Sequence, residues 1–234
     1  RKIFPNFYRS TPIVTLSESS RSELSSVLGF RQKSIHVVEP GISHSFHPSF
    51  NKSEFPLVVI AGRLSPYKQI DRVINVINKI RSTVPNVKLE IIGEGPDNDR
   101  IQNVIESLPD SNWVSLRGRV SENELVNAYQ RAWVTASASL SEGWGMTLTE
   151  AARCGTASVA SNIPGHVDAV SNGVSGYLFD NDDEFEKHLV SLLSSRDNAT
   201  SLGESASEWS SRFTWEKAAT ESFRVLASTK KTNV

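Results

Sequence analysis

Short apolar runs rich in β-branched residues alternate along most of this chain with segments of helical periodicity. The runs recur at regular intervals, at Leu57–Ala61, Lys88–Ile92, Trp113–Leu116, Trp133–Ala136, Ala157–Ala160 and Tyr177–Phe179. Several lack polar alternation, as is typical of strands that are covered on both faces. Strands that alternate with helices predict an α/β fold: a Rossmann-like, doubly wound parallel sheet with right-handed crossovers.

Helical spacing marks the segments between these strands. Apolar residues share one helix face from Ile70 to Ile80 and from Ile101 to Leu108. Ser121 predicts a capping box at the start of the next helix. Ligands of doubly wound sheets bind beyond the carboxyl ends of the strands, so functional residues are expected in the loops that follow the strands.

The two ends of the chain lie outside this alternation. A strand at Pro12–Ser17, a helix from about Glu18 to Leu28 and a strand at Ile35–Val38 predict a separate β-α-β unit. The stretch E-P-G-I-S-H-S-F-H-P and the polar N-K-S-E indicate a linker into the main sheet. A final amphipathic helix is predicted by an apolar stripe at Trp215, Ala218, Ala219, Phe223 and Leu226.

Composition narrows the class of protein. A formal net charge of −1 gives no electrostatic reason to expect nucleic acid or an anionic membrane as partner. No apolar run approaches the ~20 residues that span a bilayer, so no transmembrane segment is predicted. Cys154 is the only cysteine, which fits a reducing, cytoplasmic location, and we expect it to be a small buried hydrophobe. The chain lacks an initial Met, and we expect it to be a fragment or a processed product.

Two cations flank the turn after the first strand of the main sheet. Arg63 and Lys68 stand in the segment G-R-L-S-P-Y-K, just before the helix that begins near Ile70. Cations beside a helix N-terminus form a site for a phosphate-bearing ligand. Two solvated side chains in a surface turn are the alternative that this segment alone leaves open.

A second loop places two carboxylates around a glycine turn. Glu142 and Glu150 stand eight positions apart in S-E-G-W-G-M-T-L-T-E, between a strand and a helix that begins near Thr147. The glycines let the backbone N–H groups of residues 143–147 approach a ligand closely. Carboxylates accept hydrogen bonds from the hydroxyls of sugars and riboses. Together with the two cations, this loop predicts a nucleotide diphosphate sugar as the ligand.

Other motifs do not favour a dinucleotide cofactor or a metal. The segment G-E-G-P-D-N-D lacks the third glycine of a dinucleotide fingerprint, which would stand at Asn98. Aspartate pairs at Asp97–Asp99 and Asp180–Asp182 could share a cation. N-caps at helix starts explain both pairs more simply. We therefore expect no metal and no cofactor besides the donor substrate.

The chain resembles the family 4 retaining glycosyltransferases of the GT-B fold, the group related to sucrose and bacterial glycogen synthases. The similar segments keep the family's order over about residues 57–179. They read A-G-R-L-S-P-Y-K, I-I-G-E-G-P, L-R-G-R-V-S-E-N-E-L, S-E-G-W-G-M-T-L-T-E-A-A-R-C-G-T, P-G-H-V-D and N-G-V-S-G-Y-L-F. The resemblance implies three parts: residues 1–50 as a remnant of the N-terminal acceptor domain and the linker, residues 51–213 as the donor-binding domain, and residues 214–234 as a C-terminal helix and tail.

The resemblance also implies roles for matched residues. Arg63 and Lys68 would hold the diphosphate, and Glu142 would contact the donor sugar, which makes these three the candidate catalytic residues. Glu150 would bind the ribose hydroxyls. The donor would be a UDP- or GDP-linked hexose, held without a metal because the two cations neutralise the leaving diphosphate.

Backbone groups complete the implied site. The base would meet the backbone at Arg119 and Val120. The sugar and the β-phosphate would meet the amides of Gly143, Trp144, Gly145, Met146 and Thr147. The family's acceptor pocket and its histidine would lie in a missing N-terminal domain, so we expect the chain to be inactive alone. None of the histidines is expected to replace that residue, since each is predicted to be a surface or linker residue: His36, His44, His47, His166 and His188.

Four residues depart from the family's common pattern, and the sequence leaves the sugar, the acceptor and the class of activity open. Gln69 stands where glycine is common in the family, Trp144 where phenylalanine is frequent, Ala157 where proline is frequent, and Asp168 where many members carry glutamate. These departures leave the sugar undefined. The acceptor could be a glycan, a lipid or a small molecule, and the missing domain could associate peripherally with a membrane. A nucleotide-sugar epimerase of the same fold and a non-catalytic nucleotide-sugar-binding module are the alternatives.

Overall fold

The computed structural model describes residue 8 and residues 11–230 of the chain, which divides into two compact units. One unit combines Arg1–Ser43 with Arg212–Val234, and the other is His44–Ser211. The predicted C-terminal tail lies mostly outside the described residues. No helix in the described part of the chain has the length and apolar character needed to cross a membrane.

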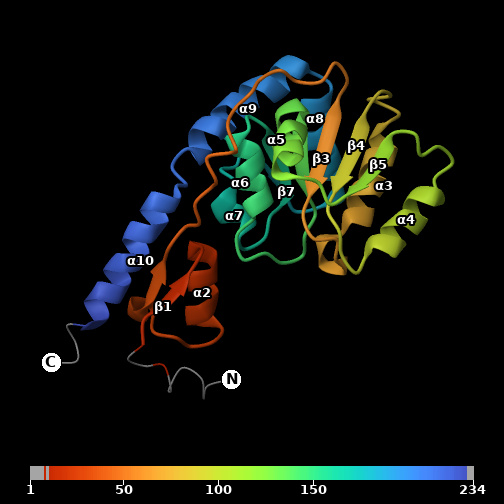
Figure 1. Cartoon of the computed structure of the whole chain (residues 1–234). Helices are drawn as coiled ribbons and strands as arrows, with labels where there is room; N and C mark the ends of the chain where they lie inside the picture. Colours follow the sequence, from red (N-terminus) through yellow and green to blue (C-terminus); the bar gives the residue numbers. More distant parts are fainter. Residues whose placement is uncertain (1–7, 9–10, 231–234) are drawn as a thin grey trace. The chain divides into compact units, whose positions relative to one another are not determined.

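The larger unit is built on a parallel sheet whose six strands follow the order β5-β4-β3-β6-β7-β8 (Figure 1). The strands are β3 (Leu57–Ala61), β4 (Lys88–Ile92), β5 (Val114–Gly118), β6 (Val134–Ser137), β7 (Ala157–Ser161) and β8 (Gly176–Phe179). From β3 the chain runs outward through β4 to β5, and then returns to pair β6 against the other edge of β3. The predicted doubly wound sheet is confirmed, and its topological switch point lies between β3 and β6.

Helices cover both faces of this sheet (Figure 1). They are α3 (Ile70–Ile80), α4 (Asn98–Glu106), α5 (Glu122–Arg131), α6 (Met146–Arg153), α7 (His166–Ala169), α8 (Asp182–Leu193) and α9 (Arg196–Ser210). The predicted stripe of α3 is buried together with the inward residues of β4 and of α8 in one apolar core. The capping box that Ser121 forms with Glu124 at the start of α5 is confirmed.

The start of α4 differs in detail from the prediction. Asp97 occupies the N-cap position, but its side chain makes no capping hydrogen bond. Its carboxylate instead binds the guanidinium of Arg100, with Nη2 and Oδ2 2.6 Å apart. At the other aspartate pair, Asn181 accepts a hydrogen bond from the amide of Glu184 and caps α8, as a helix start requires.

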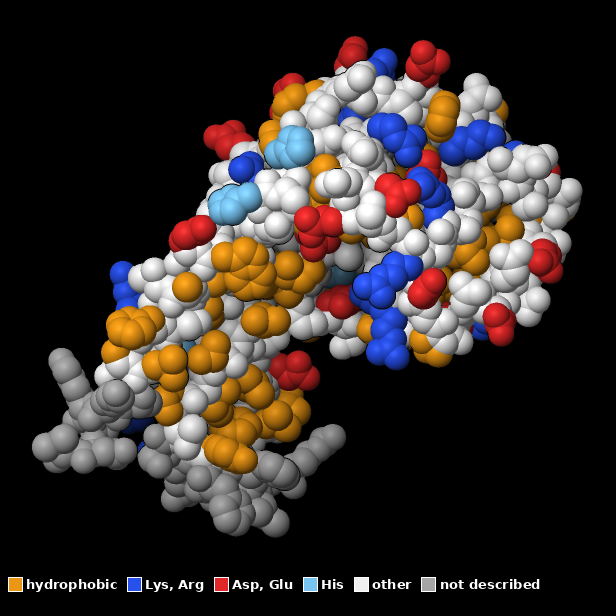
Figure 2. Space-filling view, viewed as in Figure 1, with side chains coloured by type: hydrophobic (Ala, Val, Ile, Leu, Met, Phe, Trp, Pro, Cys, Tyr) orange, Lys and Arg blue, Asp and Glu red, His pale blue; other side chains and the backbone are white. Residues whose placement is uncertain are grey.

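The smaller unit contains the predicted β-α-β segment. It comprises β1 (Ile13–Thr15), α2 (Glu18–Ser26), the 3₁₀ turn η1 (Gln32–Ser34), β2 (Ile35–Val37) and α10 (Trp215–Lys230), with β1 and β2 parallel. The amide of Ile42 donates to the carbonyl of Phe213, and Lys217 forms an ion pair with Glu39. Figure 2 shows hydrophobic side chains gathered over this unit. The large hydrophobic residues of this unit that are exposed by a third or more, among those described, are Tyr8, Val14, Leu16, Val27, Leu28, Trp215, Phe223 and Leu226.

The larger unit begins earlier than the predicted boundary at residue 51, because the segment read as a linker packs into it. Phe46 lies beside Tyr129, with ring centroids 6.3 Å apart. Lys52, which the sequence placed in a polar linker, is only 2% exposed. Its ammonium donates to the carbonyl of Gly155 and to the hydroxyl of Thr156, each at 2.7 Å. Burial lowers the pKa of Lys52 to about 7.

Candidate functional site

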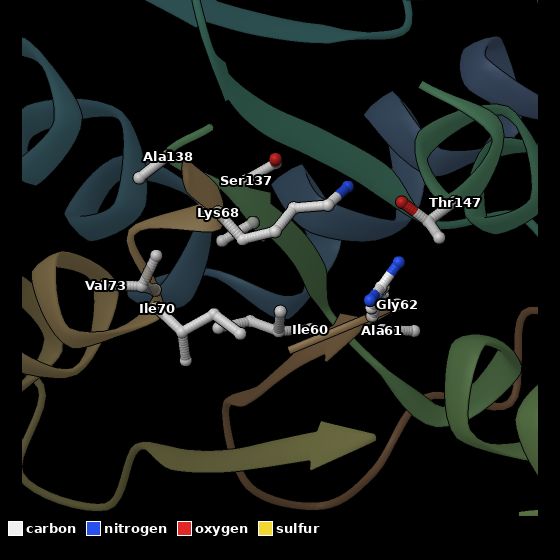
Figure 3. A pocket seen from close by; sticks show the side chains of 11 residues that line it. Ile60, Ala61, Gly62, Lys68, Ile70, Val73, Ser137, Ala138 and Thr147 are labelled. Atoms are coloured by element: carbon white, nitrogen blue, oxygen red, sulfur yellow. The ribbon is translucent and has the colours of Figure 1, made fainter. Parts of the chain in front are cut away.

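A hollow lies between the carboxyl ends of β3 and β6, at the switch point of the sheet. Figure 3 shows the Lys68 side chain running through it toward Thr147, with Ser137 on one side and Ile60 and Ile70 on the other. Lys68 comes from the 3₁₀ turn η2 (Pro66–Lys68) that leads into α3, and Arg63 also lines the hollow. The structure therefore brings the two predicted cations together at one sheet edge.

A second hollow of about 370 Å³ lies beside the first, beyond the ends of β3 and β4. Arg119 and Val120 line it, together with Glu94 from the loop after β4. Arg63 and Thr147 line both hollows, so the two are neighbours along the sheet edge. The residues predicted to meet a base and those predicted to meet a diphosphate are thus placed in adjoining spaces.

Close backbone packing joins the loops after β3 and β4 at this sheet edge. Gly93 has a φ of 134°, and a Cβ on it would collide with the carbonyl oxygen of Gly62. The amide of Gly62 donates to the carbonyl of Ile92, and the amide of Leu64 donates to that of Glu94. The segment G-E-G-P therefore packs the loop after β4 against the loop after β3, which explains its glycines without a dinucleotide.

Lys68 and Glu142 form an ion pair in the site. The Lys68 Nζ donates to the Glu142 Oε1 at 2.5 Å, and their side chains are 19% and 15% exposed. The same two loops are joined again where the amide of Leu140 donates to the carbonyl of Tyr67. The sequence predicted separate ligand contacts for the two residues, and the structure adds a direct contact between them.

The glycine turn and the start of α6 stand at the same edge. Gly145 is the N-cap of α6 with a φ of 122°, a backbone conformation that favours glycine. A Cβ on Gly143 would meet nothing within 4 Å, so the backbone there faces open space. The Trp144 side chain is only 3% exposed. The indole of Trp144 therefore belongs to the protein interior, and the backbone of the turn that faces open space is that of Gly143.

Glu150 lies one turn into α6 and lines neither hollow. The pKa of Glu150 is raised to about 7, mainly by burial and to a smaller extent by the nearby carboxylate of Glu122. Burial and the charge of Glu150 also raise the pKa of the Tyr129 hydroxyl. Glu150 therefore lies near α5. This helix begins at Glu122, shortly after Arg119 and Val120, which line the second hollow.

His166 contradicts the prediction that every histidine is a surface or linker residue. It is 1% exposed, and burial lowers the pKa of its ring. The ring is also in electrostatic reach of Glu142 and Lys68, the two members of the ion pair. The polar segment P-G-H-V-D gave no sign in the sequence that His166 is buried. The ring is buried because α7 packs closely against the loop after β6.

Gln69 has an unusual backbone conformation, and Cys154 has a thiol with a shifted pKa. Gln69, which stands where the family commonly has glycine, has a φ of 50° and is the one non-glycine residue with positive φ among those described. Cys154 is fully buried, as predicted, and burial raises the pKa of its thiol to about 12. Within the described residues, no three or more His, Cys, Asp or Glu side chains are grouped so that they could hold a metal ion.

Family comparison agrees with this architecture. Residues 43–209 match the family described as Glycosyl transferases group 1. Because the match extends over more than half of the 234 residues, the chain belongs to this family of glycosyltransferases.

Curated relatives are considerably longer than the chain. A D-inositol 3-phosphate glycosyltransferase of Mycolicibacterium smegmatis is 28% identical over 220 residues, which are 87% of this chain and 49% of that protein. A Streptococcus agalactiae protein is 29% identical over 150 residues, which are 60% of this chain and 29% of that protein. It is the GtfA subunit of a UDP-N-acetylglucosamine--peptide N-acetylglucosaminyltransferase. The chain spans about half the length of the curated relatives it matches.

Solved structures share the fold at low sequence identity. Staphylococcus aureus TarM superposes with a TM-score of 0.81 at 22% identity, over 95% of this chain and 45% of that one. The sucrose-phosphate synthase of Thermosynechococcus elongatus gives a TM-score of 0.82 at 20% identity, over 94% of this chain and 58% of that one. These likenesses confirm the Rossmann-like fold found in GT-B glycosyltransferases.

Proposed function

We propose that the chain is the donor-binding half of a family 4 retaining hexosyltransferase that uses a nucleotide diphosphate sugar. One observation carries the proposal: two adjoining hollows at the switch point of the sheet share Arg63 and Thr147. A nucleotide sugar has an uncharged base at one end, a doubly charged diphosphate in the middle and a hydroxyl-rich sugar at the other end. This order matches the larger hollow, the shared cation and the loop that carries Glu142.

Each part of the donor then has a partner. The base occupies the hollow lined by Arg119 and Val120. The ribose extends from this hollow toward the partly exposed Glu150 on α6, which accepts hydrogen bonds from the ribose hydroxyls. Arg63 and Lys68 hold the diphosphate together with the free backbone N–H groups at the start of α6. Glu142 accepts hydrogen bonds from the sugar hydroxyls, which compete with Lys68 for its carboxylate.

The chemistry that these residues support is electrostatic. As the bond between the sugar and the diphosphate breaks, negative charge grows on the leaving oxygen next to Arg63 and Lys68. Two fixed cations stabilise this charge without a metal. In the retaining reaction that we propose, the acceptor attacks from the face that the diphosphate leaves, so no protein nucleophile is needed.

Several relatives support a nucleotide sugar as the donor. A crystal structure of Anabaena HepE contains UDP and glucose, and one of the pneumococcal GtfA contains UDP and GlcNAc. A Mycobacterium tuberculosis relative is named as GDP-mannose-dependent. We therefore propose a UDP- or GDP-linked hexose as the donor, and a cytoplasmic location where such donors are made.

Calorimetric titration of the chain with UDP, GDP, ADP, UDP-glucose and GDP-mannose tests the donor site. One nucleotide family should bind, and Arg63→Ala should weaken that binding by about 1.5–3 kcal/mol through the loss of charge-assisted hydrogen bonds. Lys79→Ala is the matched control, because Lys79 is an exposed cation of α3 that pairs with Glu186. No heat with any of these ligands at millimolar concentration would overturn the proposal.

The reaction itself is tested with the chain joined to the N-terminal domain that this proposal implies. A transferase releases nucleotide diphosphate in proportion to glycosylated acceptor, whereas an epimerase converts the donor without an acceptor. A binding module does neither. For the retaining mechanism, NMR of the product should show the same anomeric configuration as the donor sugar, and an inverted product would contradict it.

A further inference from the structure

His166 is buried at the edge of the candidate site without a role in the proposed reaction. Its ring contacts the ends of two neighbouring strands, with Nδ1 3.0 Å from the carbonyl oxygen of Ser161 on β7. The Nε2 is 3.4 Å from the hydroxyl of Ser137 on β6. Ser137 also lines the hollow through which the Lys68 side chain runs (Figure 3).

These contacts define the protonation of the ring. A carbonyl oxygen can only accept, so the Nδ1 of His166 carries a proton and donates it to Ser161. In the neutral ring the Nε2 is then an acceptor, and the Ser137 hydroxyl donates to it. Burial lowers the pKa of His166, which keeps the ring neutral at physiological pH.

The ring is tied to the loop that precedes α6. The hydroxyl of Ser161, which lies 3.3 Å from the Nδ1 of His166, donates to the carbonyl of Ser139 at 2.6 Å. The hydroxyls of Ser137 and Ser139 are 3.1 Å apart. His166 therefore belongs to one hydrogen-bond cluster with the first residues of this loop.

The opposite end of the loop packs on the same short helix. A Cβ on Gly165 would lie 2.5 Å from the carbonyl oxygen of Glu142 and 3.0 Å from the nitrogen of Trp144, so only glycine allows this approach. A Cβ on Gly145 would lie 3.3 Å from the Cδ2 of His166. The His166 ring thus fills the space beneath the glycine turn while its nitrogens hold the strand ends.

We propose that His166 is a positioning residue that holds the loop of residues 139–145, and with it Glu142, in place for the donor sugar. Its consequence for sugar binding rests on the proposed function. The ring holds the loop through its contacts with β6, β7 and Gly145, independently of any ligand. His166 does not touch the proposed donor. It acts through Ser137, Ser139 and the backbone of the glycine turn.

Amide hydrogen exchange of the chain tests the loop directly, without any ligand. In His166→Ala the amides of residues 139–145 should exchange at least about tenfold faster than in the parent, equivalent to about 1.4 kcal/mol of lost protection. His166→Asn should recover part of the protection, because its side-chain N–H can still donate to the carbonyl of Ser161. His188→Ala is the matched control, since His188 stacks on Tyr177 with ring centroids 4.6 Å apart and touches no part of the loop.

The pH dependence of loop protection distinguishes a positioning role of the His166 ring nitrogens from simple filling of space by the ring. His166 is flanked by the carboxylate of Glu142 and the ammonium of Lys68. Its protonation places a cation beside Lys68 and removes the acceptor that Ser137 uses. Loop protection in the parent should therefore fall as the pH drops below the ordinary histidine range, after correction for intrinsic exchange. In His166→Phe, which keeps a ring but cannot titrate, this acid-side loss should disappear.

Ligand binding then links the loop to the sugar. With UDP and UDP-glucose as probes, His166→Asn should lose about tenfold more affinity for UDP-glucose than for UDP, because only the sugar contacts Glu142. Equal exchange rates in the parent and in all His166 variants would overturn the positioning role. Altered exchange in a chain whose parent binds neither UDP- nor GDP-linked sugars would instead overturn the proposed function and leave the positioning role standing.

Discussion

The ammonium of Lys68 and the carboxylate of Glu142 meet at 2.5 Å across 74 positions of sequence, and each is mostly shielded from solvent. The pair joins the loop after β3 to the loop after β6, on the two sides of the switch point. A ligand phosphate and a ligand hydroxyl would compete with this contact at the same time. The pair therefore makes recognition of the two ligand parts interdependent.

Glu142→Gln should tighten the binding of bare UDP or GDP, by about fivefold, because Lys68 no longer has to leave a carboxylate to meet a phosphate. The sequence assigned Glu142 to the donor sugar alone and did not reveal its pair with Lys68. Calorimetry measures the change, with Glu186→Gln as control because it alters the exposed pair with Lys79. Weaker nucleotide binding in Glu142→Gln would contradict this account.

The raised pKa of Glu150 predicts that the free energy of unfolding falls as the pH rises. Its folded-state pKa of about 7 lies above the ordinary value of 4.5, so the folded chain holds this proton more tightly than the unfolded chain. Stability should therefore fall as the pH rises from about 4.5 to about 7 and then level off. Glu150→Gln removes this loss, and it should gain roughly 2 kcal/mol on the parent between pH 5 and pH 8. Urea unfolding at both values measures the difference, and Glu204→Gln, exposed on α9, should follow the parent.

Gln69 is held in the left-handed region with a φ of 50°. Gln69→Gly should raise the free energy of unfolding by roughly 1 kcal/mol, because glycine adopts this conformation without a Cβ clash. The gain is reduced by the loss of the hydrogen bond that the side-chain Nε2 of Gln69 donates to the carbonyl of Pro66. Thermal or urea unfolding tests this, and Gln102→Gly, which lies inside α4, should lose stability instead.

Cys154 should be inert in the folded chain. Burial raises the pKa of its thiol to about 12, so almost no thiolate exists at pH 8. A thiol reagent such as DTNB should label it only when urea unfolds the chain, with a rate that follows the unfolded fraction. Rapid labelling of the native chain would show that the turn between α6 and β7 opens locally.

The chain by itself should not transfer sugar. Transfer requires an acceptor oxygen held close to the sugar carbon, and positioning of this kind supplies several kcal/mol of a reaction barrier. The site that we propose provides contacts for the donor alone, and the chain spans about half the length of its curated relatives. Incubation with the donor that binds and with a crude acceptor extract is the measurement. Turnover at roughly 1 per second or faster would refute the expectation.

Local sequence determined the elements of the larger unit and the position of the site. Unbroken apolar runs of about five residues are typical of strands covered on both faces, and their alternation with amphipathic helices leaves a doubly wound sheet as the simplest arrangement. Such a sheet directs its loops to one edge, so Arg63, Lys68 and the glycine turn before α6 could be assigned to one site from the sequence. The capping box at Ser121 could also be predicted from the sequence, because its hydrogen bonds join residues only three positions apart.

Only the tertiary structure decided the contacts between loops that are distant in sequence. The pairing of Lys68 with Glu142, the burial of His166 beneath Gly145 and the packing of Lys52 against Thr156 each join segments tens of residues apart. No local pattern encodes them, because a polar side chain looks the same in a sequence whether it meets water or a partner. Burial changes the chemistry of such groups, which is why the structure, and not the sequence, revealed the shifted pKa values of Glu150, Lys52 and His166.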